Sequence, residues 1–305
     1  MSVSQVLEVA LGLILVYYIL GSIISLITQW VNEFFETRGK TLETYLIKIV
    51  SEKKVGDFIS LPQIQALRPI RYRTPFSVVR SLTEPKKIEK IPVATLVDAY
   101  FDFIGLTAKP EMNMLQLAEL VDKLPESEGK RAFIQWINQG VTNISDLRTR
   151  TTAYFTGLME QAAATFRANA RSVVIVLSIA ITVLFGTDSI QLAKTLWTNA
   201  EARALAVAKA QMVVAQEGMD ATVSDLIQEL SDMTIRLGWW QTERPPAGAT
   251  VMDWIGFVIL KALGLGLTAA AVSQGSSFWY DFLKKLVAQN PSGVKSASDT
   301  SGGLG

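Results

Sequence analysis

The stretch of sequence that decides the fold is VALGLILVYYILGSIISLITQ, from Val9 to Gln29. It contains no charged residue, and its length is enough for about 30 Å of α-helix, which is one crossing of a bilayer. A cleaved signal peptide is the alternative, but the preceding residues carry Glu8 and no Lys or Arg, and the apolar run is too long. We therefore predict that residues 1–31 contain a first transmembrane helix.

Two further apolar runs predict two more transmembrane helices. The second, SVVIVLSIAITVLFGT over 172–187, is short for a span, but Arg167 and Arg171 before it can extend their guanidinium groups to the lipid headgroups. The third, over 254–280, is interrupted only by Lys261, whose side chain can extend back to the interface. A buried soluble helix is the alternative for the second run. A cation in a transport path is the alternative for Lys261, which has no obvious carboxylate partner inside another span.

The distribution of basic residues predicts the orientation in the membrane. The loop of residues 30–171 contains 20 Lys and Arg, whereas the loop of residues 188–253 contains 5. Because Lys and Arg accumulate in cytoplasmic loops, we expect the first loop in the cytoplasm and the N-terminus and second loop outside. The tail, residues 281–305, is then expected in the cytoplasm, and its Ser- and Gly-rich end is expected to be partly disordered.

The two segments between the spans are predicted to be helical. Residues 32–171 contain apolar stripes at helical spacing and Pro-containing turns, which favours a compact helical cytoplasmic domain over a sheet. The stripes are Leu42, Tyr45, Leu46 and Ile49, and Leu96, Tyr100, Phe103 and Ile104. From about Ser145 one long helix is expected to continue into the second span. In residues 188–253, Asn199 is expected to cap an Ala-rich helix that stops at Gly218. The expected fold class is an all-α integral membrane protein with three transmembrane helices, a helical cytoplasmic domain and a smaller helical outer loop.

The composition excludes several classes of function. The chain contains no Cys and no His, which removes thiol nucleophiles, disulfides, iron–sulfur clusters and the usual Zn and haem ligands. Its 29 basic and 28 acidic residues give no overall charge that would favour nucleic acid. Asp98 and Asp102 share one helix face, but two carboxylates do not make a metal site, and we expect a solvated face. We expect no cofactor, no metal and no nucleic-acid partner.

Each predicted span carries a stripe of small or weakly polar residues, which we interpret as a helix-packing face. The hydrophobic effect does not drive helices together in lipid, so close approach at small residues and interhelical hydrogen bonds must do so. The stripe residues are Ser22 and Ser25 in the first span, Ser178, Thr182 and Gly186 in the second, and Ala262, Gly266 and Ala270 in the third. A hydrophilic pore is the alternative, but the stripes lack charge.

The segment of residues 68–90 is locally basic, with seven Lys and Arg against two Glu. Near the cytoplasmic leaflet each such charge contributes about 1 kcal/mol toward anionic lipid. We therefore expect this segment to dock on membrane lipids or on an acidic protein partner, with a solvated turn region as the alternative. Its basic residues are Arg68, Arg71, Arg73, Arg80, Lys86, Lys87 and Lys90.

The run GSSFWYDFLKKLV, from Gly275 to Val287, is the most distinctive motif. Together with three shorter motifs, it resembles a widespread family of uncharacterised bacterial three-span inner-membrane proteins with a C-terminal Phe-Trp-aromatic-Asp run. The shorter motifs are Asn32 and Glu33 after the first apolar helix, with Lys40 to Glu43 following; Met159 and Glu160 before the second; and Leu237 to Trp239 in the outer loop. The resemblance implies a three-span layout in the bacterial inner (cytoplasmic) membrane and supplies no activity.

These observations favour a non-catalytic membrane-anchored subunit or scaffold of a larger membrane assembly, with protein partners or self-association. The absence of Cys and His and the uncharged packing faces point to contact surfaces and not to a reactive centre. An oligomeric channel or pore is the first alternative. A carboxylate-dependent membrane enzyme is the second, although the sequence supplies no convergent site.

Overall fold

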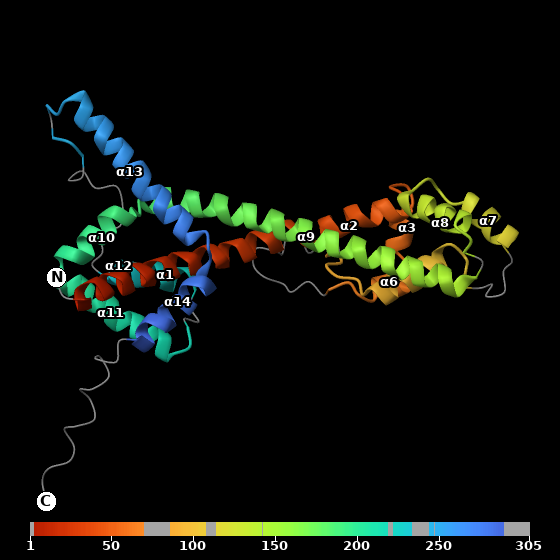
Figure 1. Ribbon diagram of the computed structural model, residues 1–305, viewed down its shortest axis with the longest axis horizontal. Coiled ribbons are helices and arrows are strands. Elements are labelled where there is room, and N and C mark those ends of the chain that lie inside the picture. The colour runs from red at the N-terminus through yellow and green to blue at the C-terminus, as the bar shows by residue number, and fades with distance from the viewer. Residues whose placement is uncertain are drawn as a thin grey trace, which may run out of the picture. The chain divides into compact units, whose positions relative to one another are not determined.

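The protein is all-helical over the part of the chain that the structure describes (Figure 1). The computed structural model describes residues 3–69, 86–107, 114–141, 143–218, 222–233, 244–246 and 248–289. Three helices are long and apolar enough to cross a membrane, namely α1 (Val3–Phe35), α9 (Ile144–Phe185) and α13 (Val251–Val272). The predicted all-α chain with three such helices is therefore confirmed.

The chain divides into two compact units that are interleaved in the sequence. Residues 1–30 and 171–305 form one unit, here the apolar unit, and residues 31–170 form the other, here the inserted unit. Both α1 and α9 contribute residues to both units. The boundaries of the inserted unit coincide closely with the segment 32–171 that the sequence predicts to be a separate helical domain.

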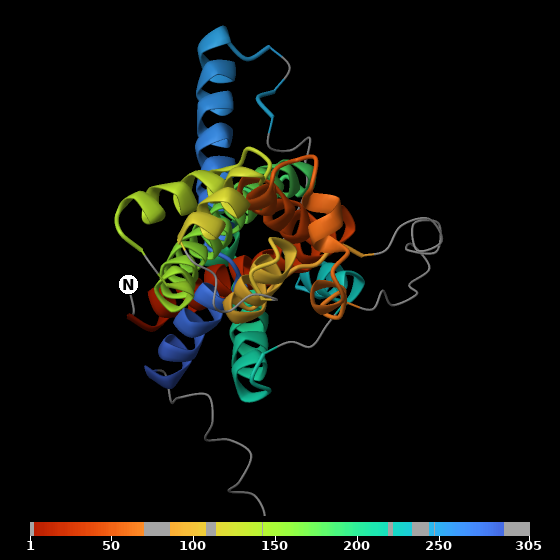
Figure 2. The ribbon, with the colours of Figure 1, turned by 90° about the vertical axis from the view of Figure 1, so that its right-hand side faces the viewer.

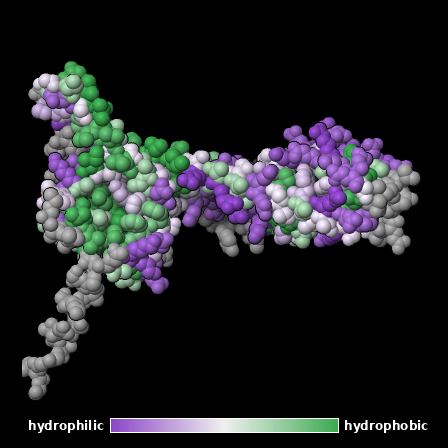
Figure 3. All heavy atoms as spheres, in the orientation of Figure 1, coloured by the Kyte–Doolittle hydropathy of each residue, from purple (hydrophilic) through white to green (hydrophobic). Residues whose placement is uncertain are grey.

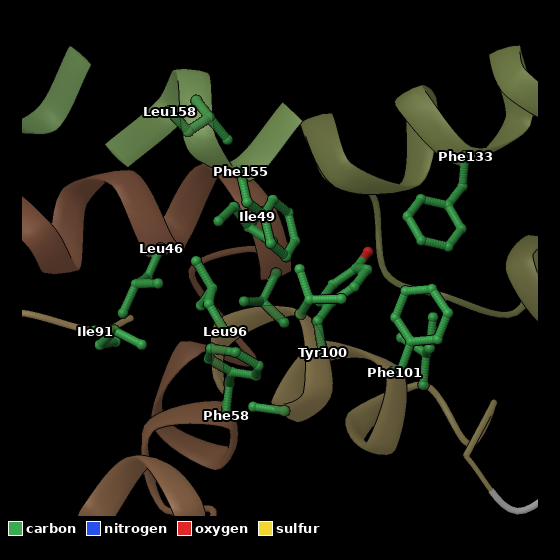
Figure 4. Close-up of a cluster of buried hydrophobic side chains, with 14 of the residues drawn as sticks. Leu46, Ile49, Phe58, Ile91, Leu96, Tyr100, Phe101, Phe133, Phe155 and Leu158 are labelled. Atoms are coloured by element: carbon green, nitrogen blue, oxygen red, sulfur yellow. The ribbon is translucent and has the colours of Figure 1, made fainter. Parts of the chain in front are cut away.

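The inserted unit is built around a single apolar core that includes both predicted stripes (Figure 4). Leu46 and Ile49 face Leu96 and Tyr100 across this core, and all four side chains are buried. The ring of Tyr100 contacts two other aromatic rings, at centroid distances of 5.4 to 5.5 Å. Burial raises the pKa of the Tyr100 phenol above its usual value, because the interior disfavours the charged phenolate. The helices are α2 (Thr37–Val50), α3 (Val55–Ile59), α4 (Pro62–Gln65), α6 (Val93–Phe103), α7 (Met114–Asp122), α8 (Glu128–Asn138) and the first part of α9.

The local signals at the helix ends agree with the sequence predictions. The long helix expected from about Ser145 is α9, which begins at Ile144 and continues without a break to Phe185. The Asn199 side chain accepts hydrogen bonds from two backbone N–H groups, at 3.0 and 3.1 Å, as expected of an N-cap. The helix that it caps, α11 (Ala200–Ala215), is followed by Gly218 at a φ of 121°, a conformation that glycine adopts without strain.

In the apolar unit, α1 is the central helix and shorter helices pack around it. Over its most apolar 18 residues 61% are buried, compared with 17% for α9 and 22% for α13. The buried cluster combines α1 residues such as Leu15 and Ile19 with Leu196, Ala206 and Leu283. The surrounding helices include α10 (Ser189–Thr198), α11, α12 (Val223–Asp232) and α14 (Ser276–Gln289) (Figure 1). Most residues in the most apolar stretch of α1 are therefore covered by protein.

The third apolar helix ends earlier than the sequence predicts. α13 stops at Val272, and the chain turns at Gly275, whose φ is 88°, before α14 begins. The expected span of 254–280 thus includes the first turn of a separate helix. The Phe-Trp-aromatic-Asp run lies in α14, and not at the end of the span.

The direction of α14 also differs from the expected layout. Its first residue, Ser276, lies near Ser25 of α1, with 3.4 Å between the two hydroxyl oxygens. The next turn lies beside earlier residues of α1, because the Trp279 and Tyr17 rings are in contact at a centroid distance of 4.9 Å. α14 therefore runs back along α1, and it packs against α11. The expected layout places the outer loop and the tail on opposite sides of the bilayer, so it does not account for this contact.

The helix α13 of the apolar unit exposes large apolar side chains along its length. On α13 the exposed side chains include Val251, Met252, Val258, Leu260 and Leu263, which point in several directions around the helix. Its first turns extend away from the other helices of the unit in both ribbon views (Figures 1 and 2). Figure 3 shows the resulting hydrophobic surface along α13. Such surface is covered by lipid or by another apolar helix in a membrane protein.

Candidate functional site

The apolar unit contains a buried ion pair between Lys261 of α13 and Asp188, the residue before α10. The Lys261 ammonium nitrogen lies 3.5 Å from Asp188 Oδ2, and each side chain is only 8% exposed. From the sequence, Lys261 has no obvious carboxylate partner inside another span, and its side chain is expected to extend back to the interface. The structure corrects this interpretation, because Asp188 supplies the partner and Lys261 is buried.

Asp188 has a second role as the N-cap of α10. Its Oδ1 atom accepts hydrogen bonds from the backbone N–H groups of Ile190 and Gln191, at 2.9 and 3.2 Å. One carboxylate oxygen therefore caps the helix while the other faces Lys261. The carboxylate lies against α13 at Gly264, where an added Cβ atom would overlap it. A glycine at this position allows α13 to approach the N-terminus of α10 closely.

A chain of hydroxyl groups extends from this ion pair to α1. Ser189 follows Asp188, and its hydroxyl lies 2.7 Å from the Tyr17 hydroxyl and 2.8 Å from the Thr268 hydroxyl. Thr268 in turn donates to the carbonyl oxygen of Gly264 at 3.0 Å. These contacts join α1, α10 and α13 through polar groups in the interior of the apolar unit. We name Tyr17, Asp188, Ser189, Lys261 and Thr268 the buried polar cluster.

The end of α9 adds two further buried hydroxyls close in sequence to Asp188. The Oγ1 atoms of Thr182 and Thr187 have no hydrogen-bond partner among the described residues.

Burying an ammonium and a carboxylate in apolar surroundings costs several kcal/mol per ion, and the cost is offset only where the charges are paired and hydrogen-bonded. In the buried polar cluster the two charges are paired, and the Asp188 carboxylate also accepts two backbone hydrogen bonds. The cluster thus brings together an ammonium, a carboxylate and three hydroxyl groups, which can exchange protons.

The ion pair was missed because Asp188 lies just outside the predicted second span of 172–187. The predicted spans themselves contain no carboxylate that could pair with Lys261. A local signal was present, since Asp188 directly precedes a helical run and Asp is a preferred N-cap residue. A carboxylate in that position lies at the end of an apolar helix, where a lysine of a neighbouring helix can reach it.

The predicted packing residues of the first two spans lie within the apolar unit as follows. Ser178, Thr182 and Gly186 of the second stripe are buried. Ser22 donates to the Tyr18 carbonyl oxygen of its own helix, and the Ser25 hydroxyl lies near that of Ser276 in α14. The second stripe therefore faces the interior of the unit.

The stripe predicted for the third span lies on a different face from the one that packs. Ala262, Gly266 and Ala270 are exposed, and a Cβ atom added at Gly266 would meet nothing within 4 Å in the part of the chain that the structure describes. The face of α13 that contacts the unit carries Gly264 and Thr268. Small residues occur on both faces, so their spacing alone did not identify the packed face. The predicted stripe remains open to contacts with another chain.

The basic segment of residues 68–90 is described only in part. Arg71, Arg73 and Arg80 lie outside the described residues. Lys86 pairs with Glu89 at 2.9 Å, and Lys87 pairs with Glu43. Arg68 and Lys87 line a cavity of about 320 Å³, and Lys90 lines a second, larger cavity in the inserted unit.

The acidic pair on α6 has a basic neighbour on α9. Asp98 pairs with Arg148 of α9, so its carboxylate already has a cationic partner. Among the described residues, no group of three or more acidic side chains is arranged to bind a metal ion.

Comparisons with known proteins supply no relative. No family model, no curated protein and no solved structure matches the chain.

Proposed function

We propose that this protein is a non-catalytic membrane-anchored subunit or scaffold, which holds the inserted unit at a membrane surface within a larger assembly. The observation that supports this most is the exposed apolar surface of α13. A helix with large apolar side chains on several sides requires lipid or another apolar helix around it. A membrane subunit with protein partners provides both.

The proposed location is the bacterial inner membrane, with the inserted unit in the cytoplasm and the N-terminus outside. The excess of basic residues in the segment 30–171 supports this orientation. The family resemblance supports the type of membrane. We propose no side for the tail, because α14 runs back along α1.

An oligomeric channel or proton path is a second candidate, and the buried polar cluster favours it. Ionisable residues inside membrane helices commonly mark ion or proton paths. Under this candidate the wild type conducts protons or ions in reconstituted vesicles, and the double variant Lys261→Met/Asp188→Asn, which leaves neither charge unpaired, does not. Under the scaffold proposal neither the wild type nor the variant conducts.

The proposed orientation predicts which single cysteines a membrane-impermeant thiol reagent can reach. The chain has no Cys, so Lys53→Cys in the inserted unit and Glu201→Cys at the start of α11 are unambiguous reporters. Glu201 lies close in sequence to Arg203, which pairs with Glu8 at 3.0 Å near the start of α1. We expect Glu201→Cys to react in intact spheroplasts and Lys53→Cys to react only after permeabilisation. The opposite pattern would contradict the orientation.

The subunit proposal predicts a stoichiometric companion when the native protein is purified in mild detergent at low salt. If an acidic partner contacts the basic segment, neutralising Arg71, Arg73, Lys86 and Lys87 together should weaken the association. Raised salt should have the same effect, because exposed charges are screened. Mass spectrometry of the purified complex measures how much companion stays bound in the charge variant and at raised salt.

A matched control removes exposed charges elsewhere in the inserted unit. Neutralising Lys53, Lys123 and Arg131 should leave the companion bound. If the wild-type protein purifies alone, with neither a companion nor self-association, the subunit proposal fails and the channel becomes the leading candidate.

A further inference from the structure

The inserted unit contains a cavity of about 500 Å³ between the start of α2, the segment before α6 and the last part of α9 that belongs to this unit. This volume is in the range of ordinary small-molecule sites. Its walls are mostly apolar and include Leu42, Ile91, Val93, Met159 and Phe166. The cavity therefore offers an apolar surface that an aliphatic chain can fill.

The charged residues of this cavity are mainly basic. Arg38 from α2, Lys90 from the segment before α6 and Arg167 from α9 all line it, together with the single carboxylate of Glu89. Glu89 is paired with Lys86 at 2.9 Å, which reduces its effect on the potential in the cavity. Three basic residues from three separate segments thus converge on one apolar cavity.

Two further features of the site favour a ligand with both an anionic and an apolar part. The Arg38 guanidinium lies over the Phe166 ring, 5.8 Å from its centroid, so an apolar wall and a cation are directly adjacent. α6 begins at Val93, which lines the cavity, and no side chain caps its N-terminus. The first backbone N–H groups of a helix carry a partial positive charge, which favours an anion in addition to the basic side chains.

Some of the residues that line the cavity are close in sequence to the apolar helices. Arg167 precedes the apolar run that begins at Ser172 by five residues of the same helix, which is about 8 Å. Arg38, in turn, follows Trp30, whose side chain is exposed near the end of α1. Tryptophan and basic residues that flank apolar helices are typical of the membrane interface.

We propose that this cavity binds an anionic phospholipid, with the phosphate between Arg38, Lys90 and Arg167 and the first part of one acyl chain against the apolar walls. A free anion would use the charges but not the apolar walls. A zwitterionic lipid would bring its own ammonium group close to the three basic residues. The proposed function requires only a membrane anchor, whereas this site requires a particular class of lipid.

Native mass spectrometry of the full chain in detergent tests the site. The probes are phosphatidylglycerol, phosphatidylcholine with the same acyl chains, and glycerol phosphate, which has the anionic group alone. We expect the wild type to retain phosphatidylglycerol at least about tenfold more strongly than phosphatidylcholine, and to bind glycerol phosphate weakly. Neutralising Arg38, Lys90 and Arg167 to Gln should reduce phosphatidylglycerol binding at least about tenfold.

Two matched controls separate the cavity from general charge and folding effects. Neutralising Lys53, Lys123 and Arg131 removes the same number of exposed charges away from the cavity and should have little effect. Ala163→Phe fills the cavity without a change of charge and should reduce binding, whereas Ala164→Phe, on the neighbouring residue that does not line the cavity, should not. Thermal melting of each variant checks that it is folded.

Three results would overturn the proposal. They are equal retention of the two lipids, equal loss in the two charge variants, and full binding by a folded Ala163→Phe variant. None of these depends on a protein companion, so failure of the lipid site and failure of the subunit proposal are distinguishable.

Discussion

Replacing Lys261 by Met is expected to destabilise the apolar unit by about 3–5 kcal/mol, because it leaves the buried Asp188 carboxylate without its cation. The side chain of Met has a similar length, so the loss would come from the charge and not from a cavity. Thermal unfolding of the purified protein in mild detergent measures the effect as a lower melting temperature.

The matched variant Asp188→Asn separates the ion pair from the helix cap. Asn is also a good N-cap residue, so this substitution keeps the contacts with α10 and removes only the charge. We expect the double variant Lys261→Met/Asp188→Asn to be more stable than Lys261→Met alone, because neither charge is then left unpaired. The equivalent single and double variants of the exposed pair Lys54 and Asp57, whose side chains are 51% and 63% exposed, should each change stability by less than about 1 kcal/mol. Wild-type stability in Lys261→Met would rule out the buried pair.

Replacing Gly264 by Leu is expected to have the second large effect. A side chain at this position would overlap the Asp188 carboxylate, so α13 would have to separate from the start of α10. Introducing such bulk into a packed contact costs about 1–3 kcal/mol, and more where the backbone must move. The variant should unfold at a lower temperature than the wild type, and protease digestion should cleave the turn before α10 more readily.

Gly266→Leu is the matched control on the same helix. A Cβ atom added at Gly266 meets none of the described residues within 4 Å, so this variant should fold as stably as the wild type. Its oligomeric state and its companions then report on the predicted stripe of Ala262, Gly266 and Ala270. Loss of assembly with unchanged melting would place that stripe at an interface between chains. If Gly264→Leu melts as the wild type does, α13 does not pack on α10 through this glycine.

Several elements of the fold could be predicted because they depend on local sequence. An apolar run long enough to cross a bilayer identifies a helix without knowledge of its neighbours, which explains the agreement for α1, α9 and α13. The Asn199 cap and the unbroken helix from Ile144 follow from the same local rules. The stripes of Leu46 and Tyr100 identified the core of the inserted unit because that unit is a compact helical domain with one apolar interior.

The packing within the apolar unit could not be predicted in this way. In a chain that is apolar on many faces, hydrophobicity does not distinguish a lipid-facing surface from one covered by protein. Whether Gly264 or Gly266 lies on the packed face of α13 depends on where Asp188 lies, and that position is set by the turn between α9 and α10. The return of α14 along α1 likewise depends on the turn at Gly275. The lipid cavity was not predicted either, because Arg38, Lys90 and Arg167 are distant in the sequence.

The interleaved arrangement of the two units imposes an order on biosynthesis. α1 is made first, yet the helices α10, α11, α12 and α14 that cover it are made only after the whole of residues 31–170 has left the ribosome. At ordinary rates of about 5–20 residues per second, α1 stays without these helices for at least several seconds. During that time its apolar surface needs the translocon, lipid or a chaperone around it. The inserted unit, by contrast, is complete once residue 170 emerges, so it can fold before the helices that pack around α1 have been made.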